Sequence, residues 1–265
     1  MAKWPVLLLS LPLAAGACLL PSLGELEGGR AADAGSDTVS IDSVAPDADA
    51  GGDAGSRWFF DDFNRPDGPL IGNGWLVKKP SSYELKGGTV RWLGGDPLSY
   101  RDHIVYRPSA EDRLDVMAQM TVTFSPTAAS PNYPQIHVRV QSISAAIPDT
   151  LDSYLLYVDD SPTLARIARQ RGSVFVTSLS AITISPQLTE GKTYRFSLSA
   201  VGTSPVVVTA SIEALTAPSQ WALLFKQTIS DTDPDRITTA GAVGFSGGDG
   251  VAGVHTYDDF STSAP

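Results

Sequence analysis

Two pairs of adjacent aspartates, far apart in the sequence, are the residues best suited to holding a cation. Asp61 and Asp62 stand near the start of a region rich in strand-forming residues, and Asp258 and Asp259 stand near its end. If the first and last strands pair, these carboxylates come close together and repel one another unless a cation or hydrogen bonds compensate. Carboxylate oxygens at strand ends suit Ca²⁺, so the sequence predicts a possible calcium site. The alternative is that these side chains cap turns or face water.

A second set of polar side chains follows one predicted strand, Ile136–Ile143. Its polar residues alternate with β-branched ones, so the polar set shares one face and would line a concave sheet. Aromatic rings elsewhere match the apolar faces of sugar rings. The alternative is structural, with the tryptophans in the core and the arginine paired with an acid. The residues predicted to contact a ligand are Trp92, Tyr100, His137, Arg139, Gln141 and Tyr154.

The sequence offers little for catalysis, and no catalytic residue is predicted. A retaining glycosidase of the sandwich type needs two carboxyl groups about 5 Å apart, carried by a Glu-x-Asp-x-Glu type of strand. No such run exists, and the glutamates Glu84, Glu111, Glu190 and Glu213 are isolated. Neither a zinc-binding HExxH pattern nor a serine nucleophile elbow is present. These observations favour binding over catalysis.

The N-terminal segment, residues 1–18, predicts export. Lys3 precedes the apolar run Val6–Leu13, and small residues lead to Cys18. The apolar stretch is interrupted by Pro5, Ser10 and Pro12 and is shorter than the roughly 20 residues of a spanning helix, although a retained membrane anchor is the alternative. The segment resembles a bacterial lipoprotein signal, with Ala15 where that pattern has leucine. The resemblance implies acylation of Cys18 and an outer-membrane or cell-surface location, and ordinary signal cleavage is the alternative.

Residues 19–56 predict a disordered linker. From Arg30 to Ser56 the sequence is built almost wholly of Ala, Asp, Gly, Ser and Val, without an aromatic residue or a lysine. Such a segment cannot bury enough apolar surface to offset the entropy lost on ordering. We therefore expect a solvated tether that holds the following domain away from a membrane surface.

Residues 57–265 predict one all-β domain, a two-sheet antiparallel sandwich. Apolar runs of four to eight residues, rich in Val, Ile, Thr, Tyr and Phe, recur between clusters of Gly, Pro, Asn and Asp, and no helical period is present. With one cysteine, the domain has no disulfide. The net charge of −10 and the lack of a basic run argue against nucleic acid as a partner. We expect a monomer.

Two motifs give this sandwich a family resemblance. The opening run from Asp61 to Trp75 contains Asp-Phe-Asn-Arg-Pro-Asp-Gly, and the closing runs are Val243-Gly244-Phe245 and Asp258-Asp259-Phe260. Together they resemble the laminin G-like jelly rolls of the concanavalin A-like lectin/glucanase superfamily. The resemblance implies a jelly roll whose first and last strands are neighbours, and some of these jelly rolls bind Ca²⁺ there. The residues predicted to form its aromatic core are Phe63, Trp75, Phe245 and Phe260.

The same family hosts lectins, glycosidases and lyases, so the resemblance specifies fold better than function. Gln135-Ile136-His137 matches a tripeptide of jelly-roll alginate lyases, but the other two strand motifs of those lyases are absent. We expect a non-catalytic, surface-anchored domain that binds a glycan or another cell-surface ligand. The alternatives are a polysaccharide-degrading enzyme of the same fold, either glycosidase or lyase, and a structural protein of the cell envelope.

Overall fold

The computed structural model of the chain describes residues 57–94, 103–108, 112–123, 134–141, 151–158, 162–172, 174–247 and 255–265. All of them belong to one compact unit, Ala50–Pro265. The signal segment with Cys18, the linker and Tyr100 lie outside the described residues, so the hypotheses about them stay predictions. Within the described ranges, no helix is long and apolar enough to cross a membrane.

The described chain is built from strands, with a 3-10 turn, η1, at Pro80–Ser82. The strand predicted to begin at Ile136 corresponds to the strand Gln135–Gln141 of the structure. The two-residue strand β2 was not predicted, because a strand this short shows no alternation. The strands are β1 (Arg57–Asp61), β2 (Leu76–Val77), β3 (Tyr83–Lys86), β4 (Thr89–Trp92), β5 (Ile104–Arg107), β6 (Val116–Thr123), β7 (Gln135–Gln141), β8 (Asp152–Val158), β9 (Leu164–Arg171), β10 (Val174–Thr183), β11 (Thr193–Val201), β12 (Val206–Ala217), β13 (Gln220–Asp231), β14 (Ala242–Ser246) and β15 (Thr256–Ser263).

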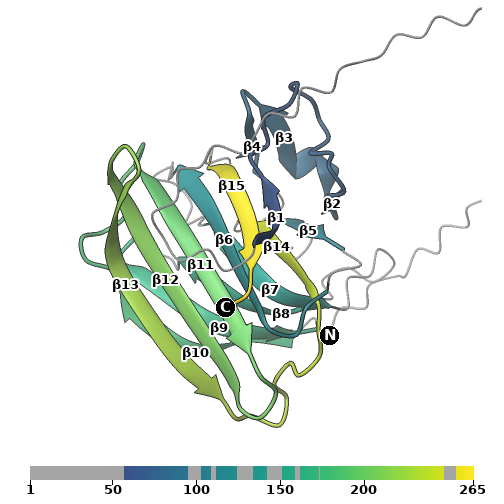
Figure 1. Cartoon of the computed structure of the whole chain (residues 1–265), viewed down its shortest axis with the longest axis vertical. Helices are drawn as coiled ribbons and strands as arrows, with labels where there is room; N and C mark the ends of the chain where they lie inside the picture. The colour runs from purple at the N-terminus through teal and green to yellow at the C-terminus, as the bar shows by residue number, and fades with distance from the viewer. Residues whose placement is uncertain are drawn as a thin grey trace, which may run out of the picture. The chain divides into compact units, whose positions relative to one another are not determined.

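The strands form two antiparallel sheets stacked as a sandwich (Figure 1). The eight-stranded sheet has the order β13-β12-β11-β6-β15-β4-β3, with β1 added beside β15. The seven-stranded sheet has the order β10-β9-β8-β7-β14-β5-β2. The prediction of an all-β, two-sheet antiparallel sandwich is confirmed.

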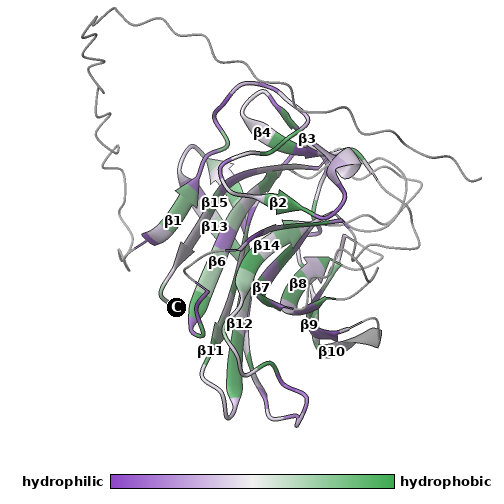
Figure 2. Cartoon of the chain, turned by 90° about the vertical axis from the view of Figure 1, so that its right-hand side faces the viewer, coloured by the Kyte–Doolittle hydropathy of each residue, from purple (hydrophilic) through white to green (hydrophobic). Residues whose placement is uncertain are grey.

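Alternation of side chains gives the sandwich its core. Along β6, every second residue from Val116 to Val122 is buried, while the residues between them are half-buried. The strands β11 and β12 follow the same pattern over most of their length. Figure 2 shows hydrophobic residues along the strands of both sheets. Two such faces packed against each other form the core, as expected for aligned sheets.

An aromatic cluster fills the core between the first and last strands. Trp75 lies 4.9 Å from Phe260 and 5.3 Å from Phe245, ring centre to ring centre, in edge-to-face geometry. Phe63 lies 5.9 Å from Trp75, and all four side chains are buried. Edge-to-face pairs each contribute about 0.5–1.5 kcal/mol beyond burial. The predicted aromatic core is therefore confirmed.

The first and last strands of the described chain meet beside this cluster. β1 runs antiparallel to β15, and Asp61 stands opposite Phe260 while Phe59 stands opposite Thr262. Figure 1 shows β1 lying against β15 although the two strands come from opposite ends of the described chain. The predicted pairing of the first and last strands is confirmed.

Candidate functional site

Asp61 has a structural role. Its carboxylate accepts hydrogen bonds from Arg65 Nη1 (2.7 Å), Asn73 Nδ2 (3.0 Å), Trp75 Nε1 (2.8 Å) and the Phe63 backbone N–H (2.8 Å). Burial alone would raise the pKa of Asp61, but these hydrogen bonds lower it below its ordinary value. The prediction of Asp61 as a calcium ligand is wrong, because protein donors occupy both carboxylate oxygens.

The remaining aspartates form an acidic cluster: Asp62, Asp258 and Asp259. Burial and the charge of Asp259 raise the pKa of Asp258 to about 6, with smaller effects from Asp62 and Asp61. Burial and Asp62 raise the pKa of Asp259, against the attraction of Arg195 and Arg57. In the described residues, no group of three or more His, Cys, Asp or Glu is arranged to hold a metal ion. The predicted set of four aspartates therefore does not fit Ca²⁺.

His137 lies on the predicted polar face of β7, but it is buried. Its Nδ1 lies 3.0 Å from Ser153 Oγ and its Nε2 lies 3.0 Å from Ser246 Oγ, whose hydroxyl also reaches Gln135 Oε1 at 3.2 Å. Burial lowers the pKa of His137 to about 3, so the imidazole is neutral at ordinary pH. With a serine hydroxyl at each ring nitrogen, it has no free atom to offer a ligand or a substrate proton.

Arg139 is also buried, and protein groups take up its donors. The guanidinium donates from Nε to Leu114 O (2.7 Å), from Nη1 to Ile237 O (2.6 Å) and from Nη2 to Gly202 O (2.8 Å). The residue has φ of 54°, at a point where the register of β7 with both of its neighbours shifts. Arg139 thus ties three connecting segments to β7.

Tyr154 faces the core and belongs to a buried ionic network. Its hydroxyl donates to Asp231 Oδ2 (2.8 Å) and accepts from the Ile237 backbone N–H (3.1 Å). Arg169 Nη1 donates to the same Asp231 carboxylate at 2.7 Å. Burial raises the pKa of Tyr154, and the hydrogen bond to Asp231 raises it further.

The predicted ligand-binding face is therefore not exposed. A side chain without exposed surface cannot stack on a sugar or donate to one, so the prediction is wrong for Trp92, His137, Arg139 and Tyr154. Trp92 packs against Tyr83 at 5.0 Å, ring centre to ring centre. Gln141 is half-buried and donates to Thr239 O (2.9 Å) and Ala240 O (2.8 Å), which fixes a neighbouring loop.

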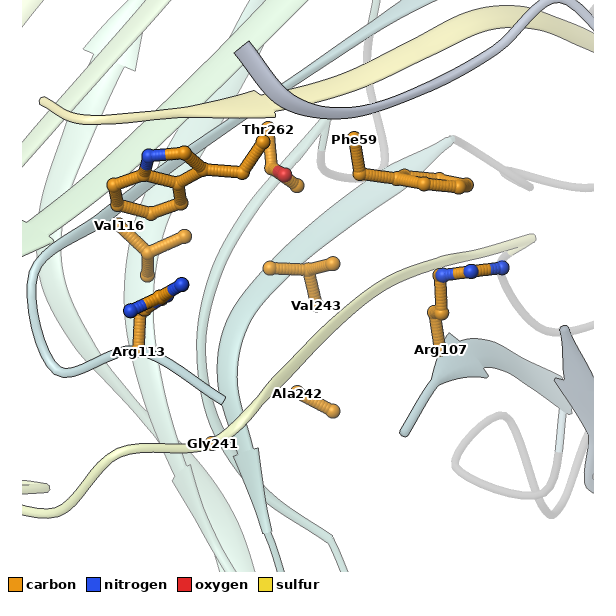
Figure 3. A pocket seen from close by; sticks show the side chains of 9 residues that line it. Phe59, Arg107, Arg113, Val116, Gly241, Ala242, Val243 and Thr262 are labelled. Atoms are coloured by element: carbon orange, nitrogen blue, oxygen red, sulfur yellow. The ribbon is translucent and has the colours of Figure 1, made fainter. Parts of the chain in front are cut away.

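An open groove lies instead at the edge of the sandwich, where β1 and β15 of one sheet face β5 and β14 of the other. Figure 3 shows this edge groove, with Arg107 and Arg113 on either side of Val243. Its rim carries two half-buried aromatic rings and two guanidinium groups, and its floor is small and apolar. The residues of the edge groove are Trp58, Phe59, Arg107, Arg113, Val116, Gly241, Ala242, Val243 and Thr262.

Each arginine of the edge groove is stacked on a ring. The guanidinium carbon of Arg107 lies 4.0 Å from the centre of the Phe59 ring, and that of Arg113 lies 5.1 Å from the Trp58 ring. In the described residues, neither guanidinium is ion-paired with a carboxylate. Cation–π stacking of this kind stabilises by about 0.5–1 kcal/mol at exposed sites.

Neighbouring backbone holds both arginines in place. Arg107 ends β5 opposite Val243, and its Nη1 donates to the carbonyl of Asn73. Gly74, at φ of +77°, leaves room for that contact, because a Cβ there would come within 2.8 Å of Arg107 Nη1. Arg113 forms an isolated antiparallel bridge with Gly241. The edge groove is thus a fixed pair of cationic donors beside aromatic rings, an arrangement suited to binding polar or anionic groups.

Sequence reasoning missed the edge groove, since its residues come from four separated segments. One local signal was available. Trp58, Phe59 and Phe60 are consecutive in a strand, and alternation cannot bury three successive aromatic side chains on one face. Such a run predicts that an aromatic ring stays at least partly outside the core.

No protein-family model matches the chain, and neither does any curated protein. Solved structures do match, and they define the class to which the fold is similar, the β-sandwiches of carbohydrate-active and carbohydrate-binding proteins. One is a xylan β-1,4-xylosidase from Bacillus halodurans C-125, with a TM-score of 0.50 and 15% identity, covering 77% of this chain and 38% of that one.

Two further structures are similar to the same extent. The CBM2 module of the evolved Dit protein of Lactobacillus casei BL23 phage J-1 has a TM-score of 0.50 and 9% identity over 78% of this chain and 95% of its own. An engineered GH43 glycoside hydrolase has a TM-score of 0.50 and 12% identity over 84% of this chain and 43% of its own. The chain thus spans less than half of the two enzymes and nearly all of the module. At these identities the likeness shows the fold alone.

Proposed function

We propose that this sandwich, a concanavalin A-like jelly roll, is a non-catalytic domain that binds carbohydrate through the edge groove. The observation that carries the proposal is the pairing of half-buried aromatic rings, Trp58 and Phe59, with guanidinium donors at an open edge. Aromatic rings pack against the apolar faces of sugars, and arginine donates to their oxygens. The sandwich folds of the similar carbohydrate-active structures support the same class of ligand.

A glycan array with the purified protein tests this proposal, run with and without a calcium chelator. The unchanged protein is expected to bind some of the glycans on the array, and Trp58→Ala is expected to bind those same glycans more weakly. Trp221→Ala is the matched control, because Trp221 is also stacked by an arginine, Arg195 at 3.9 Å, but lies outside the edge groove. Binding to no glycan, or equal loss in both variants, would overturn the proposal. The aspartates described above do not fit calcium, so chelation is expected to leave binding unchanged.

A lyase is the second candidate, on the observation that Gln135 and His137 lie on one face of β7 with Ser153 and Ser246 beside them. In a lyase, a base must remove a proton from the sugar ring, and the neutral imidazole of His137 would have to release a serine first. Appearance of unsaturated, ultraviolet-absorbing sugar ends on incubation with polyuronates would favour the lyase over the binding domain. No such product is expected.

We also propose that the domain is displayed at a cell surface by a lipid on Cys18. The small residues before this only cysteine of the chain support the proposal. Metabolic labelling with palmitate tests it: the unchanged protein is expected to take up label, and Cys18→Ser is expected to take up none. Equal labelling of both, or label in neither, would contradict the anchor and leave the glycan-binding proposal standing.

A further inference from the structure

We propose that the edge groove recognises the carboxylate of an acidic sugar, so that the ligand is a uronic-acid-containing polysaccharide. This inference rests on the proposed carbohydrate-binding function and names the chemical class of its ligand. It is carried by Arg107 and Arg113, two cations that flank one apolar floor without an acidic partner among the described residues.

Several other arginines among the described residues pair with a carboxylate, whereas Arg107 and Arg113, like Arg57 and Arg236, do not. Arg65 pairs with Asp61 at 2.7 Å, Arg91 with Glu84 at 2.9 Å and Arg171 with Asp152 at 2.8 Å. Arg195 pairs with Glu213 at 3.5 Å, and Arg169 with Asp231 at 2.7 Å. In an acidic chain, carboxylates are available to pair with cations. Two neighbouring guanidinium groups without a carboxylate partner among the described residues form a local site for an external anion.

The stacking leaves the hydrogen-bonding edge of each guanidinium available. A guanidinium that lies over a ring uses its flat face for that contact, while its N–H groups point outward in the plane. Arg107 commits Nη1 to the Asn73 carbonyl, and the Arg113 guanidinium donates to no other residue of the described ranges. The in-plane fork of N–H donors matches the two oxygens of a planar carboxylate. The stacks therefore hold the donors in a binding geometry before any ligand arrives.

The positions of the two arginines allow both to act on one ligand. Arg107 stands opposite Val243 and Arg113 opposite Gly241, two residues apart in one extended segment, or about 7 Å along it. The cavity between them measures about 20 Å³. That space takes a single functional group and not a sugar ring, so the ring would lie outside against the aromatic rim.

The apolar floor strengthens this recognition. Val116, Ala242 and Val243 present no charged group to a ligand. A charge pair beside apolar side chains is screened less than one in open water. A neutral sugar gains little from this setting, whereas a carboxylate gains from both guanidinium groups.

The test compares polygalacturonate with the same polymer after its carboxylates are reduced to primary alcohols. Titration calorimetry with the full chain is expected to show binding to the acidic polymer and at least about tenfold weaker binding to the reduced one, since a charge-assisted hydrogen bond contributes about that factor. Arg113→Gln and Arg107→Gln are each expected to lose about tenfold in affinity for the acidic polymer. Arg195→Gln is the control, because Arg195 stacks on Trp221 in the same way but pairs with Glu213.

Three outcomes would overturn the inference. Equal affinity for the acidic and reduced polymers would leave a glycan-binding domain without charge recognition. Equal losses in Arg113→Gln and Arg195→Gln would move the site away from the edge groove. Equally tight binding to dextran sulfate would replace carboxylate recognition with general attraction to polyanions. Binding to no polymer at all would instead overturn the proposed function itself. A melting curve for each variant checks that loss of affinity is not loss of fold.

Discussion

Two groups of arginines divide this molecule into an interior that is closed and an edge that is open. In the interior, Arg139 places its guanidinium nitrogens on the carbonyls of Leu114, Gly202 and Ile237, and Arg169 pairs with Asp231. At the edge, Arg107 and Arg113 lie over aromatic rings and have no carboxylate partner among the described residues.

The difference shows that residue type does not decide the role of an arginine. Burial without partners is too costly for a guanidinium, so an interior arginine must satisfy its donors within the protein. An arginine at an open edge satisfies its donors with water and can exchange that water for a ligand. The interior group is therefore expected to control stability and the edge group to control binding.

Replacing Arg139 should give the largest effect. Arg139→Met removes the donors of three carbonyls, of which that of Ile237 is buried, and we expect the free energy of unfolding to fall by about 3 kcal/mol or more. Urea unfolding followed by tryptophan fluorescence measures this change. A fall in the free energy of unfolding of less than about 1 kcal/mol is in the range of ordinary surface substitutions. That result would show that Arg139 does not differ from the edge arginines in its effect on stability.

Breaking the buried ion pair between Arg169 and Asp231 should give the second largest loss of stability. Asp231→Asn leaves the Arg169 charge uncompensated and weakens the hydrogen bond from Tyr154, so we expect a loss of about 3 kcal/mol in the same assay. Asp233→Asn is the matched control. Asp233 is exposed and lies 3.3 Å from Arg169 Nη2, and its loss should cost much less, because an exposed ion pair contributes little to stability. Equal losses would contradict the assignment of Asp231 as the interior partner.

The acidic cluster beside β1 should give a smaller effect that depends on pH. The pKa of Asp258 is about 6 in the folded protein, above its ordinary value of 3.8. The folded state therefore binds the proton more tightly, and stability falls as pH rises through this window. Asp258→Asn should remove that fall and raise the free energy of unfolding at pH 8 by about 1 kcal/mol after allowance for solvent screening.

At pH below the ordinary pKa of aspartate, Asp258→Asn and the unchanged protein should be equally stable, because the side chain at position 258 is neutral in both. Asp67→Asn provides a control of opposite sign: a hydrogen bond from the Gly87 N–H and the Lys86 side chain lower the pKa of Asp67. That substitution should lower stability at pH 8. A gain for both variants would show that net charge, and not the local cluster, is responsible.

The edge arginines should have the smallest effect on stability. Arg107→Gln and Arg113→Gln are expected to change the free energy of unfolding by less than about 1 kcal/mol, because Arg113 loses only a stacking contact and Arg107 loses a stacking contact and one hydrogen bond at an open site. Thermal melting checks this. A loss of unfolding free energy as large as that of Arg139→Met would show that the edge arginines stabilise the fold as much as the interior ones do.

Much of the fold followed from sequence because alternation and turn residues are local. The two-sheet antiparallel architecture, the aromatic core and the pairing of β1 with β15 were all predicted. Alternation also separated His137 and Arg139 from Ile136 and Val138 on β7, but it cannot tell whether the polar face is covered. In the structure every residue from Gln135 to Val140 is buried, so the predicted ligand face was wrong.

The edge groove was beyond local patterns for a different reason. Phe59 meets Arg107 only because β1 pairs with β15 in one sheet while β5 pairs with β14 in the other. The stack of Arg113 on Trp58 likewise joins separate segments of the chain. A contact between sheets depends on register and sheet order, and neither is encoded in the spacing of residues along one strand.

The late position of β14 and β15 in the chain has a consequence for synthesis. β14 lies between β7 and β5, and β15 lies between β6 and β4, so each sheet receives an inner strand from Ala242–Ser263. Until this stretch leaves the ribosome, neither sheet can close, and β1 has no strand to join. Pairing over such long sequence separations makes folding slow. The nascent polypeptide therefore cannot complete either sheet until nearly all of the described chain has been synthesised.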